Sequence, residues 1–433
     1  MEDFPDDWRP TMIARILKAL LVVAMAASAW SVQARWRALR LSVPGGISDY
    51  ESALAIDRDN PEFHYRLALV LRDDASSRDL DAAADHLGWA IELNPHAWSY
   101  HFEHGRALEL LGDASSAEAA YRRGLEHSPA GSRYHWRLAN FYLREGNTYS
   151  ALSPLAEAIR EDASLRAPAY GLLRGLGSDL VTVIEVWPED SPALGQLLRL
   201  VLADAQARDE ESLPTIQGLW SQLVEVGEEI SPGLGSLFID YLAASGDVAG
   251  ARQAWTEFMA QRGVRDPLFE SNRNALWNGG FEAPLSEAGL GWRIPELPGM
   301  HFEQVDPDCA RGDGCARLTF ENAENPTALG LEQFANVEVP RSYRLSFLAR
   351  SLGLSGDQGP YMEVVVAASG ARLASTDPIM GSSDWKLYEA SFATETGTER
   401  VVVRLRRDRS LRLDKRFSGV LWLDEVLVEE VEP

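Results

Sequence analysis

The sequence predicts a multidomain α + β protein in three parts: an N-terminal membrane segment, an α-helical solenoid and a C-terminal antiparallel β-sandwich. Three observations lead to this prediction. Residues 19–34 carry no charged side chain, small residues recur at intervals of 34 in the first half of the chain, and short alternating apolar runs bounded by Gly, Pro and Asp follow residue 275. Strict alternation is typical of half-buried strands, and a fixed repeat of roughly 20–50 residues is typical of solenoids.

The composition is that of a folded, acidic chain without an evident active site. The 433 residues carry a net charge of −24, from 65 acidic and 41 basic side chains. Nucleic-acid binding depends on Lys and Arg that neutralise phosphates, so this charge argues against a nucleic-acid partner. No nucleotide-binding, nucleophile-elbow or zinc-protease motif occurs, and no carboxylate pair is marked out for glycoside hydrolysis. We therefore expect that the protein is not an enzyme.

The first 34 residues predict that the rest of the chain is exported. Residues 1–10 form a short tail, and residues 11–34 are either a membrane anchor or a signal peptide. An anchor needs about 20 apolar residues, which this segment reaches if its basic residues extend to the membrane interface. A signal peptide needs a small-residue cleavage site, which Ala27-Ser28-Ala29 and Val32-Gln33-Ala34 both provide. The expected location is periplasmic, either anchored in the inner membrane or released by cleavage; a buried helix of a soluble protein is the remaining alternative.

Residues 46–163 are predicted to form helix pairs, and residues 164–265 keep a helical pattern with a blurred period. Two sets of small residues recur every 34 positions: Ala83, Ala117 and Ala151, and Ala90, Gly124 and Ala158. The middle pair is the clearest, with a turn at Gly112-Asp113 and with Pro129 after its second helix, which a proline cannot continue. Residues 266–274 are predicted to be a linker.

The middle helix pair resembles the tetratricopeptide (TPR) repeat. The residues that carry the resemblance are Gly105, Gly112, Ala117, Tyr121, Gly124 and Pro129. The resemblance is specific over residues 46–163 and weak over residues 164–265. It implies a solenoid that binds a protein partner on its concave face, lined by the first helix of each pair. By that resemblance the groove residues are Tyr65, Phe102, Arg106, Trp136, Asn140 and Arg144; ordinary packing and solvated charge are the alternative.

Seven of the eight histidines lie in the helical region, and His64, His101 and His135 occupy equivalent positions in three pairs. Equivalent residues of stacked helices lie roughly 10 Å apart. Zn²⁺ needs its ligand nitrogens about 2 Å from one ion, so we attribute these histidines to repeat inheritance and not to a metal site.

Residues 275–433 carry the strand pattern. The domain opens with Trp277-Asn278-Gly279-Gly280-Phe281-Glu282, continues with Gly291-Trp292, and closes with Gly419-Val420-Leu421-Trp422-Leu423-Asp424. This order resembles carbohydrate-binding modules of the family 4/9 type, which are jelly rolls related to galactose-binding-like domains. The resemblance implies a glycan or polysaccharide ligand stacked on aromatic side chains. The candidates are Trp292, Tyr361 and Trp385, and an aromatic core is the alternative.

The same resemblance implies a structural Ca²⁺ between the first and last strands, with Glu282 and Asp424 as the matching carboxylates. Ca²⁺ takes six to eight oxygen ligands, so further donors must complete the site. Two exposed carboxylates near strand ends are the alternative.

The only two cysteines, Cys309 and Cys315, enclose a short loop with two glycines. Export places them in an oxidising compartment, where neighbouring thiols usually pair, so we predict a disulfide.

A basic cluster stands out in this acidic chain. Residues 404–416 hold seven basic side chains. Such a cluster suits an anionic polysaccharide or a lipid headgroup, and a solvated hairpin is the alternative.

Together these parts predict a non-catalytic, exported adaptor in cell-envelope or exopolysaccharide assembly, which binds a protein through the helical repeats and glycan through the β-sandwich. A pure protein–protein scaffold whose β-domain does not bind sugar is the alternative, and a glycan-active enzyme is a remote one.

Overall fold

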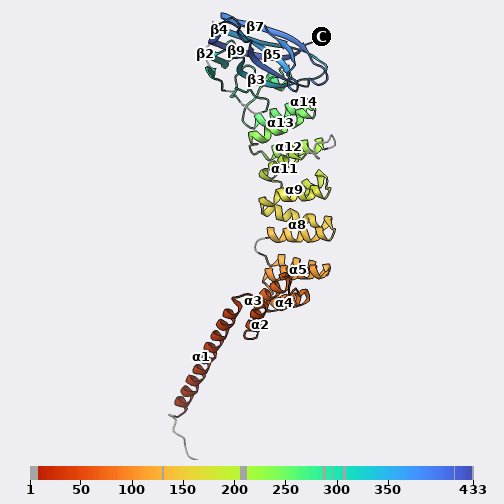
Figure 1. Ribbon diagram of the computed structural model, residues 1–433, viewed down its shortest axis with the longest axis vertical. Coiled ribbons are helices and arrows are strands. Elements are labelled where there is room, and N and C mark those ends of the chain that lie inside the picture. Colours follow the sequence, from red (N-terminus) through yellow and green to blue (C-terminus); the bar gives the residue numbers. More distant parts are fainter. Residues whose placement is uncertain are drawn as a thin grey trace, which may run out of the picture. The chain divides into compact units, whose positions relative to one another are not determined.

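The computed structural model describes residues 8–128, 131–204, 212–285, 289–294, 296–305, 309–413 and 415–431, with side chains from residue 14 onward. The chain forms two compact units, Met1–Pro188 and Glu189–Pro433. Helices precede a C-terminal antiparallel β-sandwich, which confirms the multidomain α + β prediction (Figure 1).

The first unit begins with one long helix, α1 (Trp8–Ser42). Its segment Ala14–Ser42 is long and apolar enough to cross a membrane, with a mean hydropathy of 1.6, and its most apolar stretch is not buried. A signal sequence near the N-terminus has the same properties. The helix continues past the predicted boundary at residue 34. The reason is packing: Ala38 is fully buried in a cluster with Tyr50, Ala53, Phe63 and Leu67.

The helices that follow in the first unit pack in pairs, such as α3 with α4 and α5 with α6. Their bounds are α2 Ile47–Leu54, α3 Pro61–Asp73, α4 Leu80–Leu93, α5 Trp98–Leu111, α6 Ala114–Glu126, α7 Ser132–Arg144, α8 Thr148–Glu161, a 3₁₀ turn at Ala163–Leu165, α9 Arg166–Gly175 and α10 Leu180–Glu185. Side-chain oxygens of Asn60, Asp79, Asp113 and Asn147 accept amide hydrogen bonds at helix starts. Gly112 takes φ +83° at the turn of the middle pair. Pro129 lies outside the described residues.

The second unit contains the last helices and the sandwich. The helices are α11 Ser191–Ala203, α12 Leu213–Val226, α13 Pro232–Ala244, α14 Val248–Ala260 and α15 Pro267–Glu270. The prediction of a linker at 266–274 is wrong, because this segment is packed on both sides. Phe269 is buried, Arg252 of α14 donates hydrogen bonds to the carbonyls of Phe269 and Asn274, and the Asn274 side chain bonds the backbone of Val426 and Val428.

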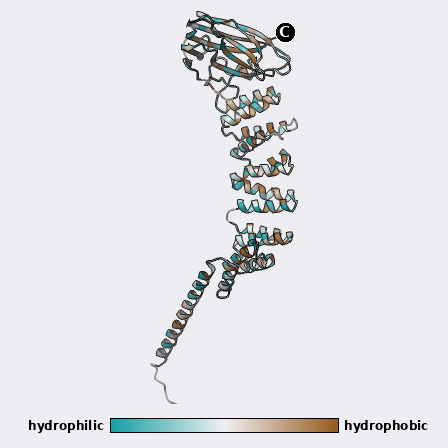
Figure 2. Cartoon of the chain, viewed as in Figure 1, coloured by the Kyte–Doolittle hydropathy of each residue, from teal (hydrophilic) through white to brown (hydrophobic). Residues whose placement is uncertain are grey.

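The sandwich consists of two antiparallel sheets. One has the strand order β1-β2-β9-β4-β7 and the other β3-β8-β5-β6. The bounds are β1 Met300–Val305, β2 Cys315–Glu324, β3 Ala328–Asn336, β4 Ser342–Leu354, β5 Pro360–Val366, β6 Arg372–Ser375, β7 Gly381–Ala393, β8 Arg400–Arg407 and β9 Arg416–Val431. Hydrophobic and hydrophilic residues are interleaved along the strands (Figure 2), and the apolar ones, such as Phe347, Val403 and Leu421, fill the space between the sheets.

Candidate functional site

A cavity of about 330 Å³ lies on the face formed by α5 and α7. It is lined by Arg106, Glu109, Leu110, Tyr121, Trp136, Arg137, Asn140 and Arg144. Four of the six predicted groove residues, Arg106, Trp136, Asn140 and Arg144, therefore meet at one place. We call this cavity the α5–α7 groove.

The other two predicted groove residues lie elsewhere. Phe102 is fully buried, with its ring 4.2 Å from that of Tyr134, so its assignment to the groove is wrong. The reason is the small residue opposite, since a Cβ on Gly124 would lie 2.6 Å from the Phe102 ring. Tyr65 is half-buried against Tyr100, with ring centroids 4.8 Å apart, and it does not line the groove.

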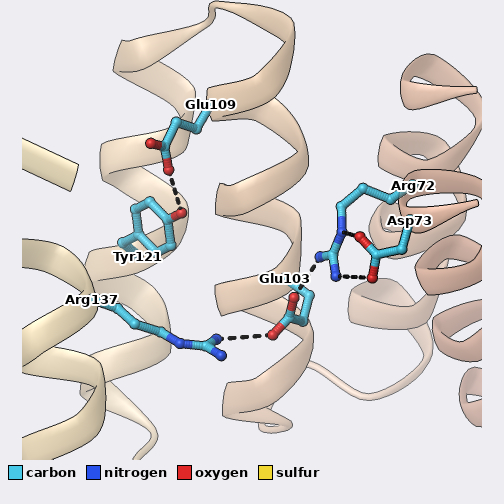
Figure 3. Close-up of polar contacts among 6 residues, drawn as sticks. All are labelled: Arg72, Asp73, Glu103, Glu109, Tyr121 and Arg137. Carbon is cyan, nitrogen blue, oxygen red and sulfur yellow. Dashed lines mark hydrogen bonds and ion pairs between the residues drawn. The ribbon is translucent and has the colours of Figure 1, made fainter. Parts of the chain in front are cut away.

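Beside the groove, three successive helix pairs are joined by one carboxylate that sequence reasoning missed. Glu103 of α5 accepts hydrogen bonds from Arg72 of α3 at 2.5 Å and from Arg137 of α7 at 2.9 Å (Figure 3). Arg72 is buried and also pairs with Asp73. Burial opposes ionisation of Glu103, but the hydrogen bonds from the two guanidinium groups outweigh it and lower the pKa of Glu103.

A second carboxylate fixes the end of the groove. The Tyr121 hydroxyl donates to Glu109 at 2.8 Å, and Arg144 donates to both oxygens of Glu109 at 2.5 and 3.1 Å. Burial, together with the neighbouring Glu109, raises the pKa of Tyr121. Arg144 is therefore paired with a carboxylate of its own chain although its side chain is exposed. The exposed Arg106, by contrast, forms no ion pair with any carboxylate that the structure describes.

Two of the three repeated histidines, His64 and His101, have a structural role at helix starts. His64 donates from Nε2 to the carbonyl of Arg58 at 2.9 Å, and His101 donates in the same way to Pro95 at 2.8 Å. Because a carbonyl only accepts, the remaining Nδ1 of neutral His64 is an acceptor, and His86 lies 2.9 Å from it. Burial and the neighbouring His64 lower the pKa of His86. Within the described ranges, no three His, Cys, Asp or Glu side chains gather where they could hold a metal ion.

In the sandwich, two of the three glycan candidates are core residues. Trp292 is 1% exposed, donates from its indole to the carbonyl of Asn278 at 3.0 Å and stacks on Phe281. Tyr361 is 7% exposed, and its hydroxyl donates to Asp408 at 2.8 Å. Both predictions of an exposed sugar platform are therefore wrong, because strands and loops cover aromatic rings that the sequence places beside Gly and Pro.

Trp385 remains partly exposed and belongs to a row of side chains on the outer face of the five-stranded sheet. Trp422 of β9 is paired in register with Arg317 of β2 and Arg350 of β4, whose guanidinium groups lie 6.0 and 5.1 Å from its ring centroid. Trp385 of β7 lies beyond Arg350, since Ala349 is paired with Lys386 and Ser351 with Ser383. We call Trp422, Arg350 and Trp385 the sheet-face row.

The two carboxylates of the predicted calcium site hold the cysteine loop by its backbone amides. Asp424 is fully buried and accepts the amide hydrogens of Ala310 and Arg311, both at 2.9 Å. Glu282 accepts the amide of Asp313 at 3.1 and 3.0 Å. Burial raises the pKa of Asp424 to about 6. These carboxylate oxygens point at amide donors, and within the described residues no third His, Cys, Asp or Glu side chain gathers with them. Asp306 and Asp308 of the neighbouring acidic loop lie outside the described residues, and Ca²⁺ at this place stays a prediction.

The predicted disulfide is present in the structure. Cys309 and Cys315 are bonded, with their Cα atoms 5.5 Å apart. The bridge closes the same loop that Asp424 and Glu282 hold by its backbone amides, so this end of the sandwich is fixed by local chemistry.

No family model and no curated protein matches the chain. Among solved structures, "CBM4 structure and function" matches 36% of this chain and 99% of its own at 15% identity, with a TM-score of 0.28. "Crystal structure of MamA protein" matches 46% of this chain and 92% of its own at 13% identity and a TM-score of 0.29. "Crystal structure of YrrB: a TPR protein with an unusual peptide-binding site" matches 52% and 96% at 12% identity and a TM-score of 0.25. Each similarity is distant and covers about half of this chain or less.

Proposed function

We propose that the protein is a non-catalytic adaptor that binds an extended protein segment in the α5–α7 groove. The observation that carries this proposal is the meeting of Trp136, Asn140 and Arg106 in one cavity. Trp136 offers apolar area, and Arg106 offers an exposed cation. Asn140 donates to the carbonyl of Trp136 at 2.8 Å, which leaves its amide oxygen able to accept a backbone N–H of a bound segment.

Selection of displayed peptides on the whole chain tests this proposal. Selected peptides should bind at least ten-fold more weakly to Trp136→Ala, because an aromatic anchor at the centre of an interface is worth about 2 kcal/mol or more. The matched control is Tyr149→Ala, which removes an aromatic side chain that is 86% exposed and outside the groove. Equal affinity for both variants would contradict the groove assignment.

A second binding function, for glycan, is supported by the sheet-face row. Two partly exposed indoles on either side of a guanidinium offer stacking surfaces to a sugar chain. Glycan-array binding of the whole chain should be lost in Trp385→Ala and Trp422→Ala, whereas Trp89→Ala, a half-exposed indole of α4, should keep it. Absence of any glycan signal from the unaltered chain would favour the pure scaffold.

We further propose that the chain is exported and works at the cell envelope. The support is the apolar helix Ala14–Ser42 near the N-terminus. A C-terminal reporter that is active only outside the cytosol should be active in a fusion, and the intact mass of the exported chain distinguishes an anchor from a cleaved signal. Activity of a cytosol-dependent reporter alone would contradict export.

A further inference from the structure

The loop between β8 and β9 exposes two leucine side chains completely. Leu411 is 95% and Leu413 is 104% exposed, more than the other large apolar side chains of the described residues. A loop that only connects two strands is better served by polar residues, because apolar surface in water is unfavourable. Binding of a partner that buries these two leucines would therefore be favourable.

The base of this loop is fixed by buried polar contacts. Arg407 is 1% exposed and donates to the carbonyl of Gln358 at 2.9 Å and to Asn325 at 3.1 Å. Ser410 is also buried; its amide donates to Asn325 and its hydroxyl to Asp357, at 2.9 and 2.6 Å. The leucines thus follow a segment that is fixed by hydrogen bonds of Arg407 and Ser410. Their exposure is therefore not caused by fraying of β8.

Basic side chains surround the leucines. Arg409 is exposed, and Arg412 is 72% exposed even though its Nε lies 3.3 Å from Asp357. Lys415 follows, with its ammonium 3.3 Å from the exposed Glu324. Arg404 and Arg406 lie on β8 and pair with Glu363. The loop itself, residues 408–415, holds three basic and two acidic residues, so it carries a small positive charge in a chain of net charge −24.

We propose that the β8–β9 loop docks on an anionic lipid surface. Leu411 and Leu413 enter the boundary between headgroups and acyl chains, and the basic neighbours pair with the lipid phosphates. Amphipathic membrane-surface binding combines these two terms, apolar insertion and attraction to anionic lipid. An anionic polysaccharide would use the same cations, but it offers no apolar phase for two fully exposed leucines. This proposal depends on neither the α5–α7 groove nor the sheet-face row.

The test uses the whole chain, held through α1 in nanodiscs of neutral phosphatidylcholine, so that the N-terminal helix is already occupied. The nanodiscs are then mixed with separate vesicles that contain about one-third phosphatidylglycerol, and co-flotation is measured. We expect capture of the unaltered chain and at least ten-fold weaker capture of Leu411→Ser/Leu413→Ser, because the apolar side chains no longer insert. Arg409→Gln/Arg412→Gln should weaken capture by about five-fold per charge.

The matched control replaces two exposed leucines elsewhere, Leu176→Ser/Leu237→Ser, and should leave capture unchanged. A second readout uses Leu413→Cys labelled with a polarity-sensitive dye, which reacts at one place because Cys309 and Cys315 are paired. The dye emission should shift to the blue on anionic vesicles. Three results would overturn the proposal: no capture by anionic vesicles, capture that is insensitive to the leucine replacement, or binding to soluble alginate with no blue shift on vesicles.

Discussion

Glu103 in the helical region, which is 14% exposed, and Asp424 in the sandwich, which is fully buried, are carboxylates that the fold holds in opposite ways. Glu103 lies between two guanidinium groups, from Arg72 and Arg137, which lower its pKa. Asp424 is fully buried and is held by the amides of a disulfide loop, and its pKa is raised to about 6. In the helical region, ion pairs therefore link neighbouring repeats. In the sandwich, the loop is held by hydrogen bonds to the Asp424 carboxylate, whose ionised form is destabilised by burial.

Of the variants that test this comparison, Glu103→Ala is expected to have the largest effect on stability. In Glu103→Ala, the buried Arg72 loses its acceptor on α5 and keeps only the adjacent Asp73. Removal of one partner of a buried ion pair costs about 3 kcal/mol, so the free energy of unfolding of the helical region should fall by that amount. Urea unfolding followed by helical circular dichroism measures it.

The control for this measurement is Glu157→Ala, which breaks an exposed pair with Arg160 on one helix. It should change the free energy of unfolding by less than about 0.5 kcal/mol. A loss at Glu103 as small as at Glu157 would show that the carboxylate does not join the repeats.

The second effect concerns the pH dependence of stability, which should have opposite signs for Asp424 in the sandwich and Glu103 in the helical region. The folded pKa of Asp424, about 6, lies above its ordinary value of 3.8, so protonation favours the folded state. The stability that Asp424 adds is therefore smallest at pH 7 and grows as the pH falls through 6, by roughly 2–3 kcal/mol on reaching pH 4. For Glu103 the sign is reversed, and its stabilisation is lost as the pH falls below its ordinary value of 4.5.

Comparison of the unaltered chain with Asp424→Asn isolates the sandwich contribution, because the two chains differ at this carboxylate alone. The difference in unfolding free energy should change with pH between 7 and 4. A difference that stays constant over that range would mean that burial does not raise the pKa of Asp424.

The smallest of the three effects is expected at the contact that buries Phe102. In Gly124→Ala the new Cβ would lie 2.6 Å from the Phe102 ring, and such overpacking costs about 2 kcal/mol. Gly88→Ala on α4 is the control, since nothing lies within 4 Å of its Cβ and the helix should gain about 0.5 kcal/mol. Thermal unfolding of both variants checks the prediction; equal melting temperatures would show that this contact does not determine the packing of the pair.

The helix pairs and most of the groove could be predicted because repeat position fixes which face a residue occupies. Trp136, Asn140 and Arg144 follow from this rule, and the disulfide follows from its short local loop. Glu103 and Glu109 could not be found in this way, since their partners lie on other helices at distances set by the stacking. Trp292 is buried in the sandwich core and its indole donates to the carbonyl of Asn278, contacts between segments for which the local sequence carries no signal.

The central claim, that a protein segment binds in the α5–α7 groove, is tested most directly by photo-crosslinking. A peptide selected on the whole chain, with a benzophenone in place of its anchor residue, is irradiated in the complex and the adducts are mapped by mass spectrometry. The account predicts adducts on fragments that contain Leu110 or Trp136, which line the groove. Adducts confined to residues 275–433, or adducts that persist in Trp136→Ala at the same yield, would contradict it.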